Sequence, residues 1–371
     1  MAVLNRQTLQ AGERIRVLVV DDSVVIRRLV THALERDPEL EVVGAAANGS
    51  IALRLIPQLN PDLLTLDIEM PEMDGLETLR RLRREYSQLR VIMFSTLTER
   101  GAEVTLEALT LGADDYVTKA SNEGSLDQSM LRLREELIPK VKQFFLFPAK
   151  SSAAPRPQAL QVFATSPRER IPSFALSAKQ QPKVVVIGVS TGGPSALGAI
   201  LPHLPAEFPL PVLLVQHMPP LFTRFLAERL QISCPLSVEE ASQGDPVIAG
   251  KILIAPGDFH LKVAARSGEV RVLLDQSPPQ NFCRPAVDAL FSSIAEVYGG
   301  AVIAAVLTGM GHDGLRGVEI LKAQGASILA QDEASSVVWG MPGAVVTAGL
   351  ADSVLPLDQI VPEILRRTDR I

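Results

Sequence analysis

A serine flanked by glycines lies where an apolar stretch ends, in the segment GVSTGGPSAL. Ser190 follows residues 184–189, which are typical of a buried strand, and a helix-like segment comes after it. A G-x-S-x-G turn between a strand and a helix exposes the serine hydroxyl as a nucleophile beside N–H groups that stabilise an oxyanion. The same glycines could instead bind a phosphate through backbone N–H groups. The segment lacks the lysine of a Walker phosphate-binding loop. It also lacks the glycine spacing and the downstream acid of a dinucleotide-binding loop, so we favour the interpretation of Ser190 as a nucleophile.

A nucleophilic serine needs a base, and only five histidines occur in the 371 residues. His217 directly follows the apolar segment VLLVQ. If this strand lies parallel to and beside the strand before Ser190, the two side chains leave the sheet at one edge and can share a hydrogen bond. The spacing leaves three candidates for the acid that orients the histidine: Asp258, Asp313 and Asp332. Glycines on both sides of Met310 permit a tight turn, which slightly favours Asp313.

A second group of polar residues ends apolar stretches in the first third of the chain. Asp21 and Asp22 follow the segment LVV, and Asp67 follows LLTL. Ser95 and Lys119 close two further predicted strands. At the carboxyl edge of a parallel sheet these five side chains would converge. Three carboxylates suit a hard cation such as Mg²⁺, and a hydroxyl with an ammonium suits phosphoryl oxygens, so the pattern predicts a Mg²⁺ and phosphoryl site.

The elements that must position the acids alternate regularly in residues 15–146. Apolar stretches bounded by turn residues predict strands at 16–20, 41–45, 62–66, 90–94 and 115–118. Segments with helical periodicity lie between and after them, at 24–35, 50–58, 76–86, 102–111 and 126–143. Five successive βα units predict an α/β domain with a five-stranded, doubly wound parallel sheet of the flavodoxin-like type.

The second half, residues 183–371, predicts another α/β domain that is mostly parallel and Rossmann-like. Its expected strands are 183–189, 211–216, 251–255, 301–307 and 326–330. Residues 260–275 read instead as a β-hairpin that turns at Ser267-Gly268. Residues 147–182 are rich in Pro, Ser, Ala and Arg and predict a linker, and residues 1–14 predict a flexible tail.

Composition narrows the class of protein. Hydrophobic residues make up 47% and charged residues 21%, the net charge is −6 and the pI is about 5.5, which argues against a general nucleic-acid binder. The two cysteines, Cys234 and Cys283, give no disulfide framework, as expected in a reducing cytoplasm. No signal peptide and no apolar stretch of about 20 residues is present, so we expect a soluble cytoplasmic protein without membrane insertion.

The segments VVDDS, LDIEMPEMDG and YVTK resemble the receiver domains of bacterial two-component response regulators. The resemblance implies that a histidine kinase donates a phosphoryl group to Asp67. The implied Mg²⁺ ligands are Asp21, Asp22, Asp67 and the carbonyl oxygen of Glu69. The implied phosphate-sensing residues are Ser95, Lys119 and the aromatic switch Tyr116. Ala120 stands where this family usually has a proline.

The segments GVSTGGPSAL, VQHMP, APGDFH and LTGMGHDG resemble the catalytic domain of the chemotaxis protein-glutamate methylesterases/glutamine deamidases, the CheB family. The resemblance implies Ser190 as nucleophile, His217 as base and Asp313 as orienting acid, with Thr191 and the Met310 N–H positioning the histidine and the oxyanion. It implies methyl-accepting chemoreceptors as substrate and no cofactor for ester hydrolysis. His312 replaces an asparagine often found there, and we expect structural roles for Asp258 and His260.

The residues alone leave other functions open. A glycine-flanked serine is also a common helix N-cap, and a histidine after a strand is often a loop residue. A receiver could equally control a non-enzymatic interaction domain or a nucleotide-binding α/β domain. A DNA-binding output is disfavoured, because no basic helix-turn-helix pattern follows the linker.

Overall fold

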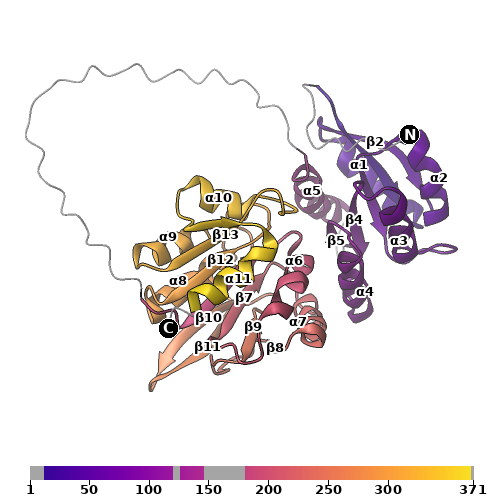
Figure 1. Cartoon of the computed structure of the whole chain (residues 1–371). Coiled ribbons are helices and arrows are strands. Elements are labelled where there is room, and N and C mark those ends of the chain that lie inside the picture. The colour runs from indigo at the N-terminus through magenta and orange to yellow at the C-terminus, as the bar shows by residue number, and fades with distance from the viewer. Residues whose placement is uncertain (1–11, 120–125, 146–179, 369–371) are drawn as a thin grey trace, which may run out of the picture.

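Two parallel sheets, one in each half of the chain, form the framework of the protein (Figure 1). The computed structural model describes residues 12–119, 126–145 and 180–368. Ala120, most of the predicted tail and most of the predicted linker lie outside these ranges. Every helix in the described part of the chain is too short or too polar to cross a bilayer.

The first sheet has five parallel strands in the order β2-β1-β3-β4-β5. The strands are β1 (Ile15–Val20), β2 (Leu40–Ala46), β3 (Leu63–Asp67), β4 (Arg90–Ser95) and β5 (Asp115–Thr118). The helices are α1 (Val24–Glu35), α2 (Gly49–Leu59), α3 (Gly75–Glu85), α4 (Glu99–Thr110) and α5 (Leu126–Lys142). The predicted doubly wound sheet is confirmed, and element ends agree to about three residues, the usual uncertainty at helix and strand ends.

Side-chain caps explain where these helices begin. Asp74 accepts a hydrogen bond from the backbone N–H of Glu77 at 2.8 Å, which starts α3 as its Asp-x-x-Glu pattern predicts. Thr98 caps α4 in the same way through the N–H of Gly101 at 3.0 Å. These caps determine where the helices begin after β3, which ends in Asp67, and after β4, which ends in Ser95.

The second sheet has seven parallel strands in the order β14-β13-β12-β6-β7-β9-β8. The strands are β6 (Val184–Val189), β7 (Val212–Gln216), β8 (Ser237–Glu240), β9 (Lys251–Ile254), β12 (Val302–Val306), β13 (Ser327–Gln331) and β14 (Ser353–Leu355). The helices are α6 (Gly193–Ile200), α7 (Phe222–Ser233), α8 (Val287–Tyr298), α9 (Leu315–Ala323), α10 (Met341–Thr347) and α11 (Leu357–Thr368), with a 3₁₀ turn η1 (Leu201–His203). The sequence did not predict β8 and β14, because these two edge strands are short and mostly polar or half-exposed.

The predicted hairpin is confirmed as a separate antiparallel pair, β10 (His260–Arg266) and β11 (Glu269–Asp275). Ser267 and Gly268 form its two-residue turn with φ angles of 51° and 85°, as a primed hairpin turn requires.

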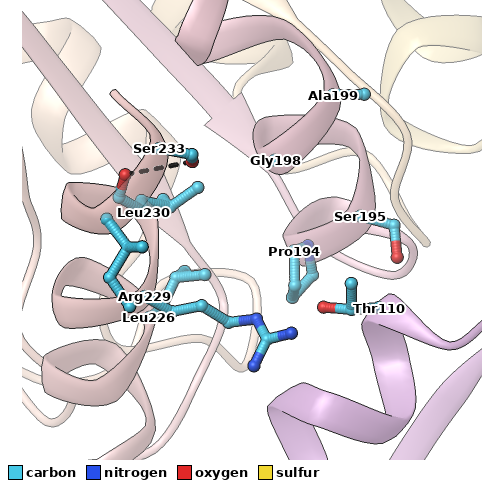
Figure 2. Close-up of a pocket in the computed structure, with 10 residues that line it drawn as sticks. Thr110, Pro194, Ser195, Gly198, Ala199, Leu226, Arg229, Leu230 and Ser233 are labelled. Atoms are coloured by element: carbon cyan, nitrogen blue, oxygen red, sulfur yellow. Dashed lines mark hydrogen bonds between the residues drawn. The ribbon is translucent and has the colours of Figure 1, made fainter. Parts of the chain in front are cut away.

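The two α/β units contact each other through α4 and β5 on one side and α6 and α7 on the other (Figure 1). The ring of Tyr116 in β5 stacks on Phe222 of α7, with centroids 4.9 Å apart and planes 8° from parallel. Ser195 of α6 donates a hydrogen bond to the Leu109 carbonyl of α4 at 2.8 Å. A pocket of about 500 Å³ remains between α4, α6 and α7, with Thr110 facing Pro194 and Ser195 in Figure 2. The contact is therefore well packed in one place and open in another.

Candidate active site

Ser190 and His217 follow neighbouring parallel strands at the same edge of the second sheet. In the register of β6 and β7, Val189 lies opposite Gln216, so the next residue of each strand is Ser190 or His217. The side-chain amide of Gln216 donates a 2.9 Å hydrogen bond to the Ser190 carbonyl. The two strands therefore lie parallel and adjacent, which is the condition under which the sequence analysis brings Ser190 and His217 together.

Close packing of glycines holds the Ser190 turn. The Ser190 N–H donates to the carbonyl of Thr308, after β12, at 3.0 Å. A Cβ atom on Gly309 would lie 2.7 Å from the Ser190 Cβ, and one on Gly193 would lie 1.8 Å from Oε1 of Gln216. The glycines therefore allow the backbone of three strand ends to meet around the serine.

Only Asp313 among the three candidate acids reaches His217. Its Oδ2 lies 2.8 Å from Nε2 of the imidazole. Asp258 instead accepts a hydrogen bond from Arg284 at 3.0 Å, and Asp332 bonds within its own loop. Of the three acids that the sequence spacing allowed as the partner of His217, the structure thus places only Asp313 in contact with it.

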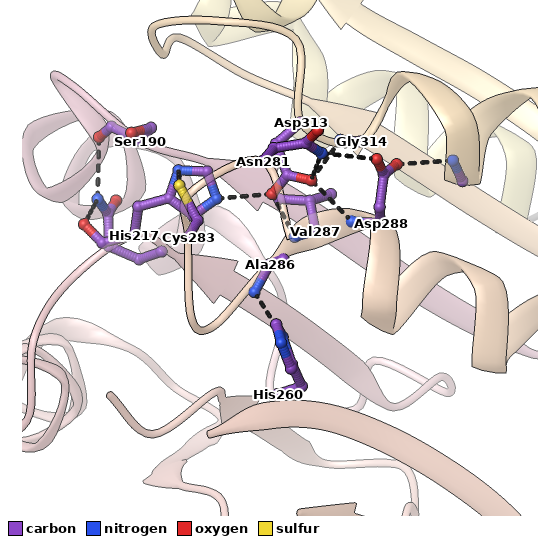
Figure 3. A network of polar contacts seen from close by, with 12 residues as sticks. Ser190, His217, His260, Asn281, Cys283, Ala286, Val287, Asp288, Asp313 and Gly314 are labelled. Atoms are coloured by element: carbon purple, nitrogen blue, oxygen red, sulfur yellow. Dashed lines mark hydrogen bonds and ion pairs between the residues drawn. The ribbon is translucent and has the colours of Figure 1, made fainter. Parts of the chain in front are cut away.

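The Asp313 carboxylate is held at the N-terminus of α8. It accepts hydrogen bonds from the backbone N–H groups of Val287 at 2.6 Å and Asp288 at 3.2 Å. Gly314 N–H at 3.1 Å and the Asn281 side chain at 2.9 Å complete the set shown in Figure 3. Burial raises the pKa of Asp313, but the hydrogen bond from His217 and these donors outweigh it and leave the pKa below its usual value.

The His217 imidazole has a partner on each nitrogen. Nε2 contacts Asp313, and Nδ1 lies 3.6 Å from the Sγ of Cys283. Burial lowers the pKa of His217, but the hydrogen bonds to Asp313 and Cys283 raise it to about 10. Among the described residues, the Ser190 hydroxyl makes no hydrogen bond with His217. Nδ1 is the nitrogen that could accept the serine proton, since Asp313 occupies the other.

Thr191 and Met310 contribute backbone N–H groups beside Ser190. No described residue accepts a hydrogen bond from either N–H. The Thr191 hydroxyl, however, points to the first domain, where it contacts Asp115 Oδ2 at 3.0 Å and Gln143 Oε1 at 3.3 Å. The two free N–H groups have the character of oxyanion donors, and one of them belongs to a residue that the other domain holds.

Asp21, Asp22 and Asp67 meet at the carboxyl edge of the first sheet. One carboxylate oxygen from each lies within 4.8 Å of the others. Lys119 Nζ lies 2.7 Å from Asp67 Oδ1 and 2.9 Å from Asp21 Oδ2. Glu69 lines the same cleft of about 260 Å³, and the buried Oδ2 of Asp67 has no hydrogen-bond partner in the described part of the chain. This donor set fits Mg²⁺, which prefers carboxylate and carbonyl oxygens.

Burial raises the pKa of Asp67 to about 6, against the hydrogen bond from Lys119, and the charge of Asp21 adds to the increase. Burial acts to lower the pKa of Lys119, but the hydrogen bonds and negative charges of Asp67 and Asp21 outweigh it, so this pKa is raised. The three carboxylates face a single ammonium group, that of Lys119, so the cluster carries excess negative charge. A divalent cation would neutralise this excess.

Ser95 and Tyr116 connect the acidic edge to the second domain. The Ser95 hydroxyl donates to the Gly101 carbonyl at 3.1 Å and accepts from Thr105 at 2.7 Å, both in α4. Tyr116 is buried against Phe222. Two of the three predicted phosphate-sensing residues, Ser95 and Tyr116, therefore touch elements that form the domain contact.

Comparison with known proteins identifies both halves. The CheB methylesterase family model matches residues 185–364, and the response regulator receiver domain model matches residues 17–131. A protein-glutamate methylesterase/protein-glutamine glutaminase of a Nocardioides species is 53% identical over 361 residues, covering 96% of each chain. The chain belongs to the CheB methylesterase family.

A further curated relative and a solved structure are similar to this chain. The protein-glutamate methylesterase/protein-glutamine glutaminase of Trichodesmium erythraeum is 49% identical and covers 95% of this chain and 99% of its own. The solved CheB methylesterase catalytic domain of Thermotoga maritima is 46% identical, with a TM-score of 0.49, and covers 52% of this chain and 100% of its own.

Several contacts of the site escaped the sequence analysis. Gln216 had a signal, because it immediately precedes His217 and ends the same strand. Asn281, Cys283 and Asp288 had none, since they come from a loop and a helix with no motif of their own. Asp115 contacts Thr191 from the other domain, a pairing that no local pattern reveals.

Proposed function

We propose that this protein hydrolyses glutamate γ-methyl esters on chemoreceptors, and deamidates receptor glutamines, under control of its receiver domain. The observation that carries the proposal is the meeting of Ser190, His217 and Asp313 at one sheet edge in a chain of this family. We assign residues 15–146 to the receiver, 147–182 to the linker and 183–371 to the catalytic domain, and place the enzyme in the cytoplasm.

Ser190 attacks the ester carbonyl carbon while its proton passes to Nδ1 of His217. The oxyanion of the tetrahedral intermediate accepts hydrogen bonds from the N–H groups of Thr191 and Met310. The C–O bond then breaks, His217 returns the proton, and methanol leaves. Water, deprotonated by His217, attacks the acyl-serine and releases glutamate and Ser190. A glutamine substrate follows the same steps and releases ammonia.

Asp313 has the role of orienter. Its contact with Nε2 fixes the proton of the neutral imidazole on that nitrogen, so that Nδ1 can act as the base, and it stabilises the imidazolium formed during attack. The five donors around its carboxylate keep it ionised and immobile.

The receiver would hold Mg²⁺ through Asp21, Asp22, Asp67 and the Glu69 carbonyl, and the ion would offset negative charge as Asp67 accepts a phosphoryl group from a histidine kinase. Ser95 and Lys119 would then bind the phosphoryl oxygens. A hydroxyl drawn toward the phosphate would loosen its bonds to Gly101 and Thr105 and shift α4.

This shift would reach Ser190 through the domain contact. In the structure, Asp115 holds Thr191, and Tyr116 stacks on Phe222. We propose that these contacts restrain the active site until phosphorylation of Asp67 separates the domains.

The test is methanol release from methylated chemoreceptor membranes. We expect wild type to release methanol, and acetyl phosphate with Mg²⁺ to raise the rate about 10- to 100-fold, the range open to a minor state of a few per cent. Asp67→Asn should remove the response and keep the basal rate. Release that ignores the phosphodonor would retain the esterase and refute the control; no release from a folded protein would refute the esterase.

An interface variant tests the restraint without touching the catalytic residues. Ser195→Asp places a carboxylate against the Leu109 carbonyl in the last turn of α4, where the carbonyl oxygen and the negative end of the helix dipole repel it. We therefore expect the basal rate to rise about 10-fold and the phosphodonor response to shrink. Ser195→Ala is the matched control, because it removes one hydrogen bond worth about 1 kcal/mol and adds no charge. Equal basal rates in all three proteins would contradict the restraint.

A further inference from the structure

Phe282 is an aromatic side chain that the rest of the chain leaves uncovered. Its relative exposure is 104%, the largest among the exposed large hydrophobic residues of the described chain. Its φ angle is 64° and that of Asn281 is 49°, so two successive non-glycine residues have left-handed backbone. Such a conformation is rare for a bulky residue and persists only where the surroundings enforce it.

The surroundings of Phe282 do enforce it. Gln280 and Cys283 exchange two backbone hydrogen bonds of 3.0 and 2.8 Å across the turn. Downstream, Arg284 is anchored to Asp258 at 3.0 Å, and upstream the buried His260 contacts the Pro278 carbonyl at 3.2 Å. The loop between β11 and α8 is thus fastened on both sides, and the fold sets the direction of the Cα–Cβ bond of Phe282.

This loop is also part of the catalytic site. Asn281 donates a 2.9 Å hydrogen bond to Asp313, and Cys283 contacts His217 (Figure 3). Phe282 is the residue between them. Met310, 39% exposed, is the residue after Gly309, which packs on Ser190. Two apolar side chains therefore lie at the rim of the site, one on an anchored turn and one a flexible methionine.

We infer that Phe282 is a specificity-determining residue that binds an apolar side chain of the protein substrate beside the glutamate being hydrolysed. The inference rests on the proposed function. The ring of Phe282 packs against nothing within the chain, although its backbone conformation is unfavourable, so we expect the ring to contribute by a contact that forms on binding. If the glutamate stands on a helix of the substrate protein, the side chains three and four residues away lie on the same face and can reach Phe282. A small glutamate γ-methyl ester has no such neighbouring side chains.

The test compares two substrates and two variants. Methylated receptor and a small blocked glutamate γ-methyl ester are assayed with wild type, Phe282→Ala, Phe282→Gly and the control Val354→Ala, an exposed residue of the edge strand β14. For both Phe282 variants we expect the ratio of receptor to small-ester kcat/KM to fall about 10- to 100-fold, chiefly through KM on the receptor. The Val354→Ala ratio should match wild type.

Thermal unfolding separates binding from a structural role. Because the ring makes no internal contact, Phe282→Ala should leave the unfolding temperature of the catalytic domain unchanged. Phe282→Gly should raise it by about 2–4 °C, since glycine relieves the left-handed backbone. A variant that loses both receptor selectivity and thermal stability would assign Phe282 to the fold and overturn the inference.

The remaining outcomes are distinct. An unchanged ratio in both Phe282 variants overturns the inference and leaves the proposed function intact. Wild type that cleaves the small ester but not the receptor refutes the receptor as substrate and Phe282 as its contact. Wild type that cleaves neither refutes the proposed function. Loss of a dimer in Phe282→Ala by sedimentation would make this surface an interface between copies of the chain, which also overturns the inference.

Discussion

Replacing Ser190 by alanine is expected to lower kcat for methanol release from methylated receptors by a factor on the order of 10⁶. The variant has no hydroxyl to form the acyl-enzyme, so the remaining rate comes only from water attacking an ester polarised by the Thr191 and Met310 N–H groups. The fold should be retained, because the Ser190 hydroxyl makes no hydrogen bond in the described part of the chain and its backbone contacts survive.

A serine at the opposite edge of the same sheet provides the control. Ser327 begins β13 at its amino end, so Ser327→Ala should hydrolyse the ester at the wild-type rate. Trapping with a serine-directed phosphonate, followed by mass spectrometry, should label Ser190 in wild type and nothing in the alanine variant. Methanol release by Ser190→Ala above about one-hundredth of the wild-type rate would rule out the proposed nucleophile.

Replacing Asp313 by asparagine is expected to lower kcat about 10⁴-fold, the loss that follows when a triad histidine is held in the wrong tautomer. An amide in place of the carboxylate would present a donor or a neutral acceptor to Nε2 of His217. The imidazolium formed during attack would also lose its counter-charge. The measurement is the plateau rate of methanol release at high pH, where the histidine is neutral.

The same variant should shift the pH profile in a defined direction. His217 acts as a base only when neutral, and its pKa is raised to about 10, so the wild-type rate should rise with pH into the alkaline range. Without Asp313 the pKa should fall toward 6.5, and the rising limb should move to lower pH. In the wild type, the raised pKa of His217 also stabilises the fold. This stabilisation is complete below about pH 6.5 and is lost as the pH rises to 10.

Cys283→Ala is the matched comparison for this shift. It removes the second contact that raises the pKa of His217, so the rising part of the pH profile should move to lower pH while the plateau rate stays near wild type. A profile that is identical in wild type, Asp313→Asn and Cys283→Ala would mean that another group controls the limb.

Most of the structural features that the sequence predicted concern the strands and the residues at their ends. Apolar runs followed by Asp21, Asp67, Ser190 or His217 mark the carboxyl ends of parallel strands, and parallel strands bring their ends to one edge. Both sheets and the hairpin follow from such patterns, with the edge strands β8 and β14 as exceptions. The choice of Asp313 over Asp258 and Asp332 is visible only in the structure, because it depends on which loop crosses the edge to reach His217.

Contacts between distant segments account for the rest. Asn281 and Cys283 reach the catalytic residues from a loop whose direction depends on anchors at Asp258 and His260. The hydrogen bond between Asp115 and Thr191 joins residues 76 positions apart in two domains. Such pairings leave no periodic pattern and no motif in the sequence, so they can be found only in the three-dimensional structure.

The bond between Asp115 and Thr191 also has a thermodynamic consequence that runs in the opposite direction to control by phosphate. If a phosphoryl group on Asp67 and a receptor at Ser190 both favour the separated domains, each must strengthen the binding of the other by the same factor. Receptor engagement would then favour the phosphorylated state at equilibrium with a phosphodonor. The phosphorylated share of the enzyme would be greatest where methylated substrate is most abundant, and it would fall as that supply is consumed.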